Sequence, residues 1–561
     1  MKMLAQTLMS LALATVLAVS GMAQAPSAAE QSPAAPSPNV AGQPAGQSAE
    51  SPRLIVFITV DQYRADYLTR FSDLYLPPRD GQGRPGGFRF LSEEGADYRA
   101  AAYQHYETFT CPGHASLVTG AVPAVHGIIG NGWYDRKARR WLWSCTMGLD
   151  EAPSGPQRLM VSTIGDEMKL AWGGRSKVVS IAVKDYAAIL MGGRRADSVL
   201  WLDRHTGLWT SNENYGDLPQ WAVAVNESKP MDAAAGKQWT PLLDPQRYWH
   251  LLPWRDQTGT TFTHDYGWPQ NPNFYNSLAR RPPANEMLFD TLEKAVQEGQ
   301  LGSDEVPDLL LVSLSSNDYT GHDFGPFSPE LLDITVRSDR LLSSFFAALE
   351  DQVGLDRTLI VLSSDHGVTP VPDRLREAGV PAGRVGMDEF LNPVDEMLDS
   401  IYGEADWIWG FNKNDVYINH DAVYDLAEGD LEKVCEIAAQ VLELNGAVYS
   451  VYTRADLLEG DYPPSPYGKM LANGYHPKRG GDVVVLFRPH HFPGDLTTTH
   501  GTIHAYDRRV PVLLRGPGIR AGTYYRKVSP TDIVPTLCQV LGIGYPAGAS
   551  GQPLREALKA Q

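Results

Sequence analysis

Three short apolar runs in this sequence each end in side chains that bind metal ions well. Residues 54–60 are followed by Asp61, residues 309–314 by Asp318 and His322, and residues 358–362 by Asp365 and His366. Such runs are typical of buried strands, and in an open α/β sheet the ligand crevice lies beyond the carboxyl ends of the strands. We therefore expect these side chains to meet at one edge of a sheet and to form a metal site.

His500 and Thr110 complete the candidate metal-binding set. Imidazole and carboxylate groups suit Zn²⁺, and six such ligands with one hydroxyl would serve two metal ions better than one. Paired metal ions about 3.5–4 Å apart stabilise the attacking and leaving oxygens of phosphoryl transfer. An isolated Asp-His pair is usually a surface turn or a cap, so the hypothesis depends on three strand ends that carry the same chemistry.

Thr110 opens the segment Thr-Cys-Pro-Gly-His, in which Pro112 favours the start of a helix. Backbone N–H groups at such a start favour anions, and a metal-bound hydroxyl there can attack phosphorus. The alternative is that Thr110 only caps the helix. Cys111 suggests a sulfatase, but the sulfatase pattern Cys-x-Pro-x-Arg is absent. We interpret His114 as a structural hydrogen-bonding residue.

Strands that alternate with helices predict an α/β fold, with a mostly parallel sheet covered by helices on both faces. The apolar spacing over 328–350 predicts a long helix. We expect a catalytic domain over 53–561, with insertions at about 132–284 and a small α/β cap at about 370–480. The net charge of −18 argues against nucleic acid as the main partner.

The N-terminus predicts export. Lys2, the apolar stretch 8–19 and Ala23-Gln24-Ala25 are typical of a signal peptide over 1–25, and the Pro-, Ala- and Ser-rich residues 26–52 predict a disordered linker. The apolar stretch is too short to span a membrane, so we expect a periplasmic or secreted protein. We also expect the protein to be a monomer. Four cysteines allow three disulfide pairings, between which the sequence does not choose.

Six ordered motifs resemble those of the alkaline phosphatase superfamily. More closely, they resemble its single-chain bacterial PafA-type phosphatases, which are related to the nucleotide pyrophosphatase/phosphodiesterases. The motifs are Val60-Asp61-Gln62, Thr110-Cys111-Pro112-Gly113-His114, His126-Gly127-Ile128-Ile129-Gly130-Asn131, Asp318-Tyr319-Thr320-Gly321-His322, Ser364-Asp365-His366-Gly367 and Thr499-His500-Gly501. The resemblance implies the superfamily's fold and two zinc ions, with Thr110 as the nucleophile. One ion would be held by Asp318, His322 and His500, and the other by Asp61, Asp365 and His366.

The resemblance also implies that Asn131 and Lys184 bind the phosphoryl oxygens. Tyr186 stands where those phosphatases have arginine. Arginine offers a charged, bidentate fork, whereas tyrosine offers one neutral donor, and losing a charged contact costs about 1.5–3 kcal/mol. Arg194 and Arg195 follow nearby and are candidates to compensate.

We therefore predict an exported, zinc-dependent phosphatase that hydrolyses small-molecule phosphate monoesters through a phosphothreonine. The alternative enzyme is a phosphodiesterase with the same two-metal core, because a diester monoanion needs fewer positive charges than a monoester dianion. A sulfatase and a metal- or phosphate-binding protein without catalysis are further alternatives.

Overall fold

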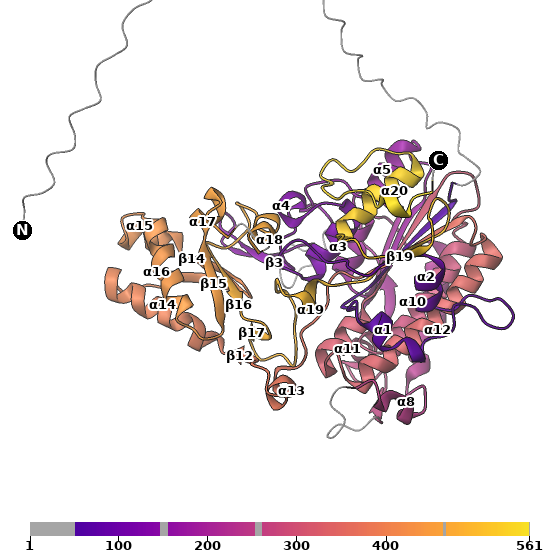
Figure 1. Cartoon of the computed structure of the whole chain (residues 1–561), viewed down its shortest axis with the longest axis horizontal. Helices are drawn as coiled ribbons and strands as arrows, with labels where there is room; N and C mark the ends of the chain where they lie inside the picture. The colour runs from indigo at the N-terminus through magenta and orange to yellow at the C-terminus, as the bar shows by residue number, and fades with distance from the viewer. Residues whose placement is uncertain (1–50, 146–154, 253–260, 464–466, 560–561) are drawn as a thin grey trace, which may run out of the picture. The chain divides into compact units, whose positions relative to one another are not determined.

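The computed structural model describes residues 51–145, 155–252, 261–463 and 467–559 (Figure 1). The predicted signal peptide and nearly all of the predicted linker lie outside these residues. Within them, no helix combines the length and the apolar character that crossing a membrane requires.

The central sheet consists of nine strands: β1 Leu54–Val60, β2 Ala96–Tyr98, β5 Val178–Ala182, β6 Ser198–Asp203, β7 Leu208–Thr210, β10 Asp308–Leu314, β11 Thr358–Ser363, β18 Val512–Arg515 and β19 Gly522–Tyr524. Their order is β19-β2-β18-β11-β1-β10-β5-β6-β7. The five strands from β11 to β6 run parallel, whereas β7 and β18 pair antiparallel with their neighbours β6 and β11. The predicted α/β class and mostly parallel sheet are confirmed.

Helices cover both faces of this sheet (Figure 1). They include α3 Thr110–Thr119, α5 Ile164–Ala171, α10 Pro282–Gln297, α12 Pro329–Gln352 and α20 Ile533–Leu541. Successive strand residues point to opposite faces, so Val56 and Ile58 of β1 pack toward α10 and α12, whereas Ile55 and Phe57 pack toward α3, α5 and α20. The central strands are buried on both faces, which explains their unbroken apolar sequence.

The segment from 132 to 284 is not one continuous insertion, contrary to our expectation. It supplies β5, β6 and β7 to the central sheet. Trp201 of β6 and Trp209 of β7 are buried, as are Trp221 and Trp239. These tryptophans therefore belong to the core, where large buried rings take the place of the aliphatic pattern that marks a strand.

A smaller sheet forms the core of the predicted cap. Its strands are β13 Ile408–Asn412, β14 Asp415–Ile418, β15 Val448–Thr453 and β16 Val483–Phe487, in the order β13-β14-β16-β15. The helices α14 (Met387–Tyr402) and α16 (Leu431–Glu443) pack against it (Figure 1). The cap extends past residue 480, where we expected it to end, because β16 pairs with the distant strand β14.

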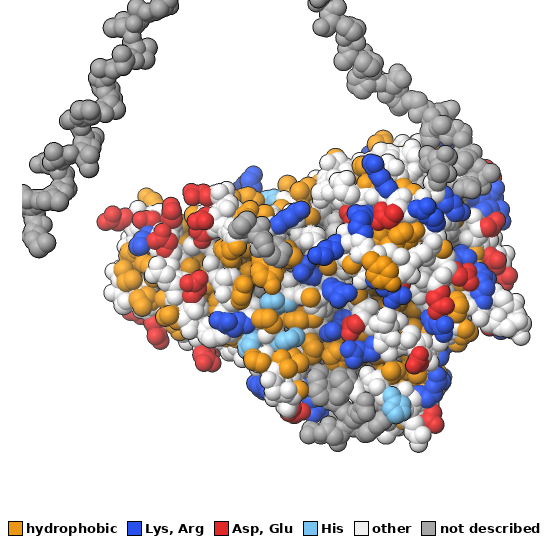
Figure 2. All heavy atoms as spheres, in the orientation of Figure 1, with side chains coloured by type: hydrophobic (Ala, Val, Ile, Leu, Met, Phe, Trp, Pro, Cys, Tyr) orange, Lys and Arg blue, Asp and Glu red, His pale blue; other side chains and the backbone are white. Residues whose placement is uncertain are grey.

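Shorter elements carry or flank residues of the site: β3 Gly132–Asp135, β4 Arg140–Trp143, α6 Asp185–Gly192, α9 Phe274–Ala279, α11 Ser316–Phe324, β17 His491–Pro493 and α19 Ala505–Arg508. All four cysteines are buried, and none of them forms a disulfide bond. Basic and acidic side chains are interspersed on the face drawn in Figure 2.

Candidate active site

The carboxyl ends of the central parallel strands bring the predicted ligands together. Asp61 directly follows β1, and Asp365 and His366 lie just after the neighbouring strand β11. Asp318 and His322 lie one turn apart on α11, which begins just after β10, the other neighbour of β1. Three adjacent strands thus deliver five of the six ligands to one edge of the sheet.

The sixth ligand does not follow a strand of the central sheet. His500 lies in the loop between β17 and α19, and it reaches the site through its own contacts. Its Nε2 is 3.8 Å from Asp318 Oδ1, and its ring stacks on that of His366 with 3.5 Å between the centroids. The local sequence around His500 offers no periodicity that would have predicted this position.

Thr110 is the first residue of α3, and its side chain faces the predicted ligand His366. Thr110 Oγ1 lies 3.2 Å from His366 Nε2. The N-cap residue of α3 is Phe109, and no side chain accepts a capping hydrogen bond at this helix start. Thr110 therefore does not act as the helix cap, and its hydroxyl is directed toward the predicted ligands.

The start of α3 packs directly against the backbone at Asp365. A Cβ on Gly113 would lie 2.3 Å from Asp365 O, so only glycine allows this approach. The adjacent His114 donates from Nδ1 to Thr110 O at 2.9 Å and places Nε2 3.0 Å from Ser313 Oγ of β10. Its Nδ1 is also 3.3 Å from Asp365 Oδ2, a longer contact for the same hydrogen atom. These contacts agree with a structural role for His114.

The three predicted histidine ligands are held in the same way. The Nδ1 atom of each lies close to a backbone carbonyl oxygen: His322 to Thr498 O at 2.9 Å, His366 to Gly367 O at 2.9 Å and His500 to Thr108 O at 2.8 Å. A carbonyl only accepts, so each Nδ1 carries a hydrogen atom and Nε2 of the neutral ring carries a lone pair. Burial lowers the pKa of His366 and of His500, which favours that neutral state. This is the tautomer that binds a metal ion through Nε2.

Two buried carboxylates contact the ammonium group of Lys184. Lys184 Nζ lies 2.8 Å from Asp61 Oδ2 and 2.6 Å from Asp318 Oδ2. Burial and the neighbouring Asp365 raise the pKa of Asp61 well above its ordinary value. Burial would also raise the pKa of Asp318, but the charge of Lys184 holds it well below its ordinary value. When Asp61, Asp318 and Asp365 are all ionised, Lys184 balances only one of the three negative charges.

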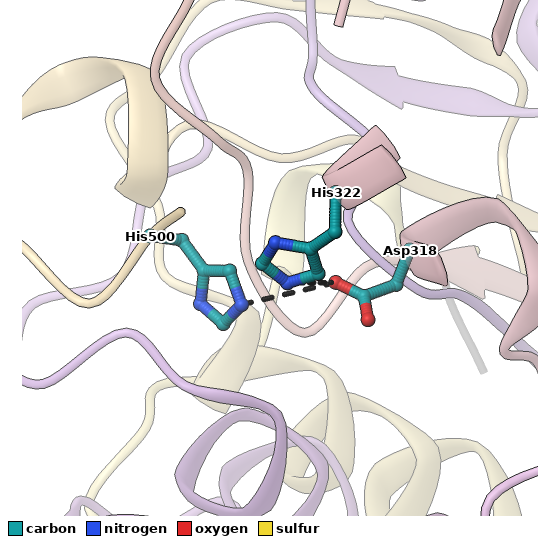
Figure 3. A group of neighbouring side chains, drawn as sticks. All are labelled: Asp318, His322 and His500. Atoms are coloured by element: carbon teal, nitrogen blue, oxygen red, sulfur yellow. Dashed lines mark ion pairs between the residues drawn. The ribbon is translucent and has the colours of Figure 1, made fainter. Parts of the chain in front are cut away.

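The six ligands form two groups that fit metal ions. Within each group, one ligand atom per residue lies within 4.8 Å of the others: Asp318, His322 and His500 in the first group, and Asp61, Asp365 and His366 in the second. Figure 3 shows the first group, whose side chains point toward one another, with His322 Nε2 3.2 Å from Asp318 Oδ1.

The second group contains an unpartnered oxygen. Among the described residues, Asp61 Oδ1 has no hydrogen-bond donor, and it lies 3.6 Å from the lone pair of His366 Nε2. Two lone pairs that face each other in a buried site repel unless a cation lies between them. Nitrogen and carboxylate oxygen donors in this combination fit zinc.

A pocket of about 470 Å³ opens onto Thr110, and Asn131, Lys184 and Tyr186 line it. Asn131 Oδ1 accepts a hydrogen bond from Cys111 N at 2.9 Å, so its Nδ2 is the group left to donate to a ligand. The Tyr186 ring centroid lies 5.8 Å from Lys184 Nζ. Cys111 is buried and does not line this pocket, which disfavours a sulfatase nucleophile at that position.

Two further cations, Arg280 and Lys413, line the pocket and were not among the predicted site residues. Arg280 follows α9, forms an ion pair with Asp323 and lies 4.7 Å from the centroid of the Tyr319 ring. Lys413 lies in the turn between β13 and β14 and donates to Thr499 Oγ1 at 2.9 Å. Both depend on contacts between segments distant in sequence.

The two arginines that were candidates to compensate for Tyr186 lie outside the pocket. Arg194 and Arg195 are exposed, and neither lines the pocket. Arg194 donates to the carbonyl oxygens of Leu159 and Val161. A second pocket of about 790 Å³, lined by Arg64 and Arg509 among others, contains none of the predicted site residues.

Known proteins resemble this chain over most of its length. The alkaline phosphatase PhoV of Synechococcus elongatus is 32% identical over 91% of this chain and 94% of PhoV. The alkaline phosphatase PafA of Elizabethkingia meningoseptica is 30% identical over 90% of this chain and 94% of PafA. A Myroides odoratus protein named calcium-transporting ATPase is 31% identical over 92% of this chain and 96% of its own length.

The solved structure of wild type alkaline phosphatase PafA has the same fold. It covers 91% of this chain and 100% of its own chain, with a TM-score of 0.83 and 28% identity. The family described as Type I phosphodiesterase / nucleotide pyrophosphatase matches residues 55–502. The chain therefore belongs to this family, within the alkaline phosphatase superfamily, and it is a phosphoric ester hydrolase.

Proposed function

We propose that this protein is an exported, zinc-dependent phosphatase that hydrolyses small-molecule phosphate monoesters through a phosphothreonine. The observation that carries the proposal is the arrangement beside Thr110, where three Nε2 atoms in the metal-binding tautomer face three buried carboxylates. Two zinc ions held by the two ligand groups would supply Lewis-acid stabilisation of charge on the attacking and leaving oxygens.

Thr110 performs the first transfer in this proposal. A bond forms from its Oγ1 to phosphorus while the bond from phosphorus to the ester oxygen breaks, which yields phosphothreonine and the alcohol. Water then attacks phosphorus, the bond to Oγ1 breaks, and Thr110 and inorganic phosphate are released. Thr110 lies at the N-terminus of α3, where backbone N–H groups favour the anion.

Asn131 and Lys184 hold the transferred group in place. Asn131 presents its Nδ2 donor, and Lys184 presents a buried ammonium beside both ligand groups. Hydrogen-bond donors and cations fixed in advance around the equatorial oxygens stabilise the charge of phosphoryl transfer without reorganisation.

The proposal is tested by metal content and by turnover of two substrates. We expect purified protein to contain zinc by elemental analysis and to hydrolyse an aryl phosphate monoester faster than the matching diester. Thr110→Ala should lower monoester kcat/KM by roughly 10³-fold or more, whereas Thr110→Ser should retain measurable activity. Rapid acid quenching and mass spectrometry should detect phosphate on Thr110. A zinc-loaded wild type that hydrolyses neither ester would instead indicate a binding protein without catalysis.

Phosphodiester hydrolysis is the second candidate function. It is favoured by Tyr186, which offers the substrate no positive charge. The pocket also has an apolar wall that suits the second substituent of a diester, formed by Phe109, Trp141, Leu142, Trp143 and Leu496. Faster turnover of the diester than of the monoester would establish this function instead.

We also propose that the protein acts as a monomer in the periplasm or outside the cell. The N-terminal signal pattern supports export. Fractionation of the native producing cells and light scattering of the purified protein test location and oligomeric state respectively. Retention of the protein in the cytoplasmic fraction would contradict export.

A further inference from the structure

The turn between β13 and β14 connects the cap to the active site. On one side of the turn, Asn412 Nδ2 donates to Gly132 O at 2.8 Å. Gly132 directly follows Asn131, which lines the pocket. On the other side, Asn414 Nδ2 donates to Glu107 Oε1 and to Gly501 O, each at 2.9 Å. These three contacted segments lie beside the pocket asparagine, the nucleophile and a metal ligand. The position of the turn is therefore tied to the site itself.

Lys413 lies between these two asparagines and reaches into the pocket. Its Nζ donates to Thr499 Oγ1 at 2.9 Å and lies 5.0 Å from the centroid of the Phe109 ring. Thr499 precedes the ligand His500, and Phe109 precedes the nucleophile Thr110. The backbone of Lys413 has φ of 53°, a left-handed conformation that is uncommon for lysine and usual for glycine or asparagine. Strained residues of this kind cluster at ligand sites.

Among the described residues, Lys413 is the cation of this pocket that forms no ion pair. Lys184 is paired with two carboxylates and Arg280 with one. The Lys413 ammonium has a hydroxyl partner and an aromatic face, neither of which neutralises its charge. The carboxylates of Glu107, Asp318 and Asp507 act on its charge from farther away without forming an ion pair with it. A partly buried cation in this state beside a pocket attracts an anionic ligand.

We propose that Lys413 binds an oxygen of the substrate's phosphoryl group and selects dianionic monoesters over monoanionic diesters. This inference rests on the proposed phosphatase function. The cap thereby supplies the positive charge that Tyr186 does not supply from α6. Lysine provides a point charge rather than a planar fork, so its contact with a phosphoryl oxygen does not require the fixed orientation that an arginine at position 186 would need.

The test is Lys413→Asn, compared with wild type and Lys413→Arg. Asparagine tolerates a left-handed backbone, so this variant keeps the turn and removes the charge. We expect monoester kcat/KM to fall by roughly 10- to 100-fold and diester kcat/KM by less than about 3-fold. The inhibition constant of inorganic phosphate should rise by the same factor as the monoester loss. Lys413→Arg should recover most of the monoester activity.

Asn414→Ala provides the matched structural control. It removes two hydrogen bonds of the turn and no charge, so it should lower monoester and diester turnover by similar factors. If Lys413→Asn also lowers both by similar factors, or changes neither, Lys413 does not select the dianion. A wild type that is inactive on both esters would refute the phosphatase function itself, which is a separate outcome.

Discussion

Replacing Gly113 by alanine separates two opposite expectations. Inside a helix, alanine is more favourable than glycine by about 1 kcal/mol, so local propensity predicts a more stable protein. The structure predicts the reverse, because a Cβ at Gly113 would lie 2.3 Å from Asp365 O, where real contacts are essentially never below 3.0 Å. The start of α3 and the chain at Asp365 must therefore separate by at least about 0.7 Å, the difference between these two distances. Backbone atoms form this contact, so no side chain can rotate away to relieve it.

The separation would act on the nucleophile and a ligand at once. Thr110 lies on the same helix turn as Gly113, whereas Asp365 belongs to the second ligand group. A misplacement of about 1 Å between reacting groups can lower a rate by roughly 100-fold. We therefore expect Gly113→Ala to lower monoester kcat/KM by roughly 100-fold, to reduce zinc retention and to lower the Tm.

Three measurements test this expectation: kcat/KM with excess zinc, zinc content after gel filtration, and thermal unfolding. Gly165→Ala in α5 is the matched control, because its Cβ would meet only side-chain atoms, the nearest being Val178 Cγ1 at 3.0 Å. It should retain activity and zinc. Wild-type activity and zinc content in Gly113→Ala would refute the argument that the contact between α3 and Asp365 sets the geometry of the site.

The remaining predictions concern charge. Tyr186→Arg adds a charged fork to the pocket and should raise the ratio of monoester to diester kcat/KM about tenfold, whereas Tyr186→Phe should not; an unchanged ratio would discredit the charge argument. A chelator should lower the Tm, and added zinc should restore it, because removing the ions leaves the carboxylates of Asp61, Asp318 and Asp365 with Lys184 as their ammonium partner. A constant Tm would mean that the two ligand groups hold no ion in the folded protein. Burial raises the pKa of Asp507 from 3.8 to about 7, so the folded protein keeps a proton that the unfolded chain releases. The stability that this proton gives the wild type is lost as the pH rises from 3.8 to about 7, so the Tm of Asp507→Asn relative to wild type should increase over that range. A Tm difference between the two proteins that does not change with pH would contradict this sign.

The positions of five of the six proposed ligands could be predicted because they follow from local sequence, and His500 is the exception. Asp61, Asp318 and Asp365 stand just after apolar runs, and parallel strands bring their carboxyl ends to one edge. Thr110 could be placed at a helix start from the proline that follows it by two residues. These inferences need only strand direction and helix geometry.

The rest of the pocket depends on tertiary contacts that no local pattern encodes. Lys413 reaches the site because the cap turn is bonded to segments before and after it in the sequence. Arg280 lies at the end of a short helix in a segment that we expected to be an insertion. The sequence Asn412-Lys413-Asn414 was the available signal for a tight turn, but it did not indicate what the turn would face.

The backbone carbonyls that hold the three imidazoles have an evolutionary consequence. Many metal-binding histidines depend on a neighbouring carboxylate, which a single mutation can delete. Here the acceptors belong to the main chain of Thr108, Gly367 and Thr498, and every amino acid has that oxygen. A substitution at 108 or 498 therefore keeps the acceptor oxygen, and what limits it is the buried hydroxyl that each threonine donates to another carbonyl oxygen. At Gly367 the limit is space, because a Cβ there would lie 2.1 Å from Tyr506 O.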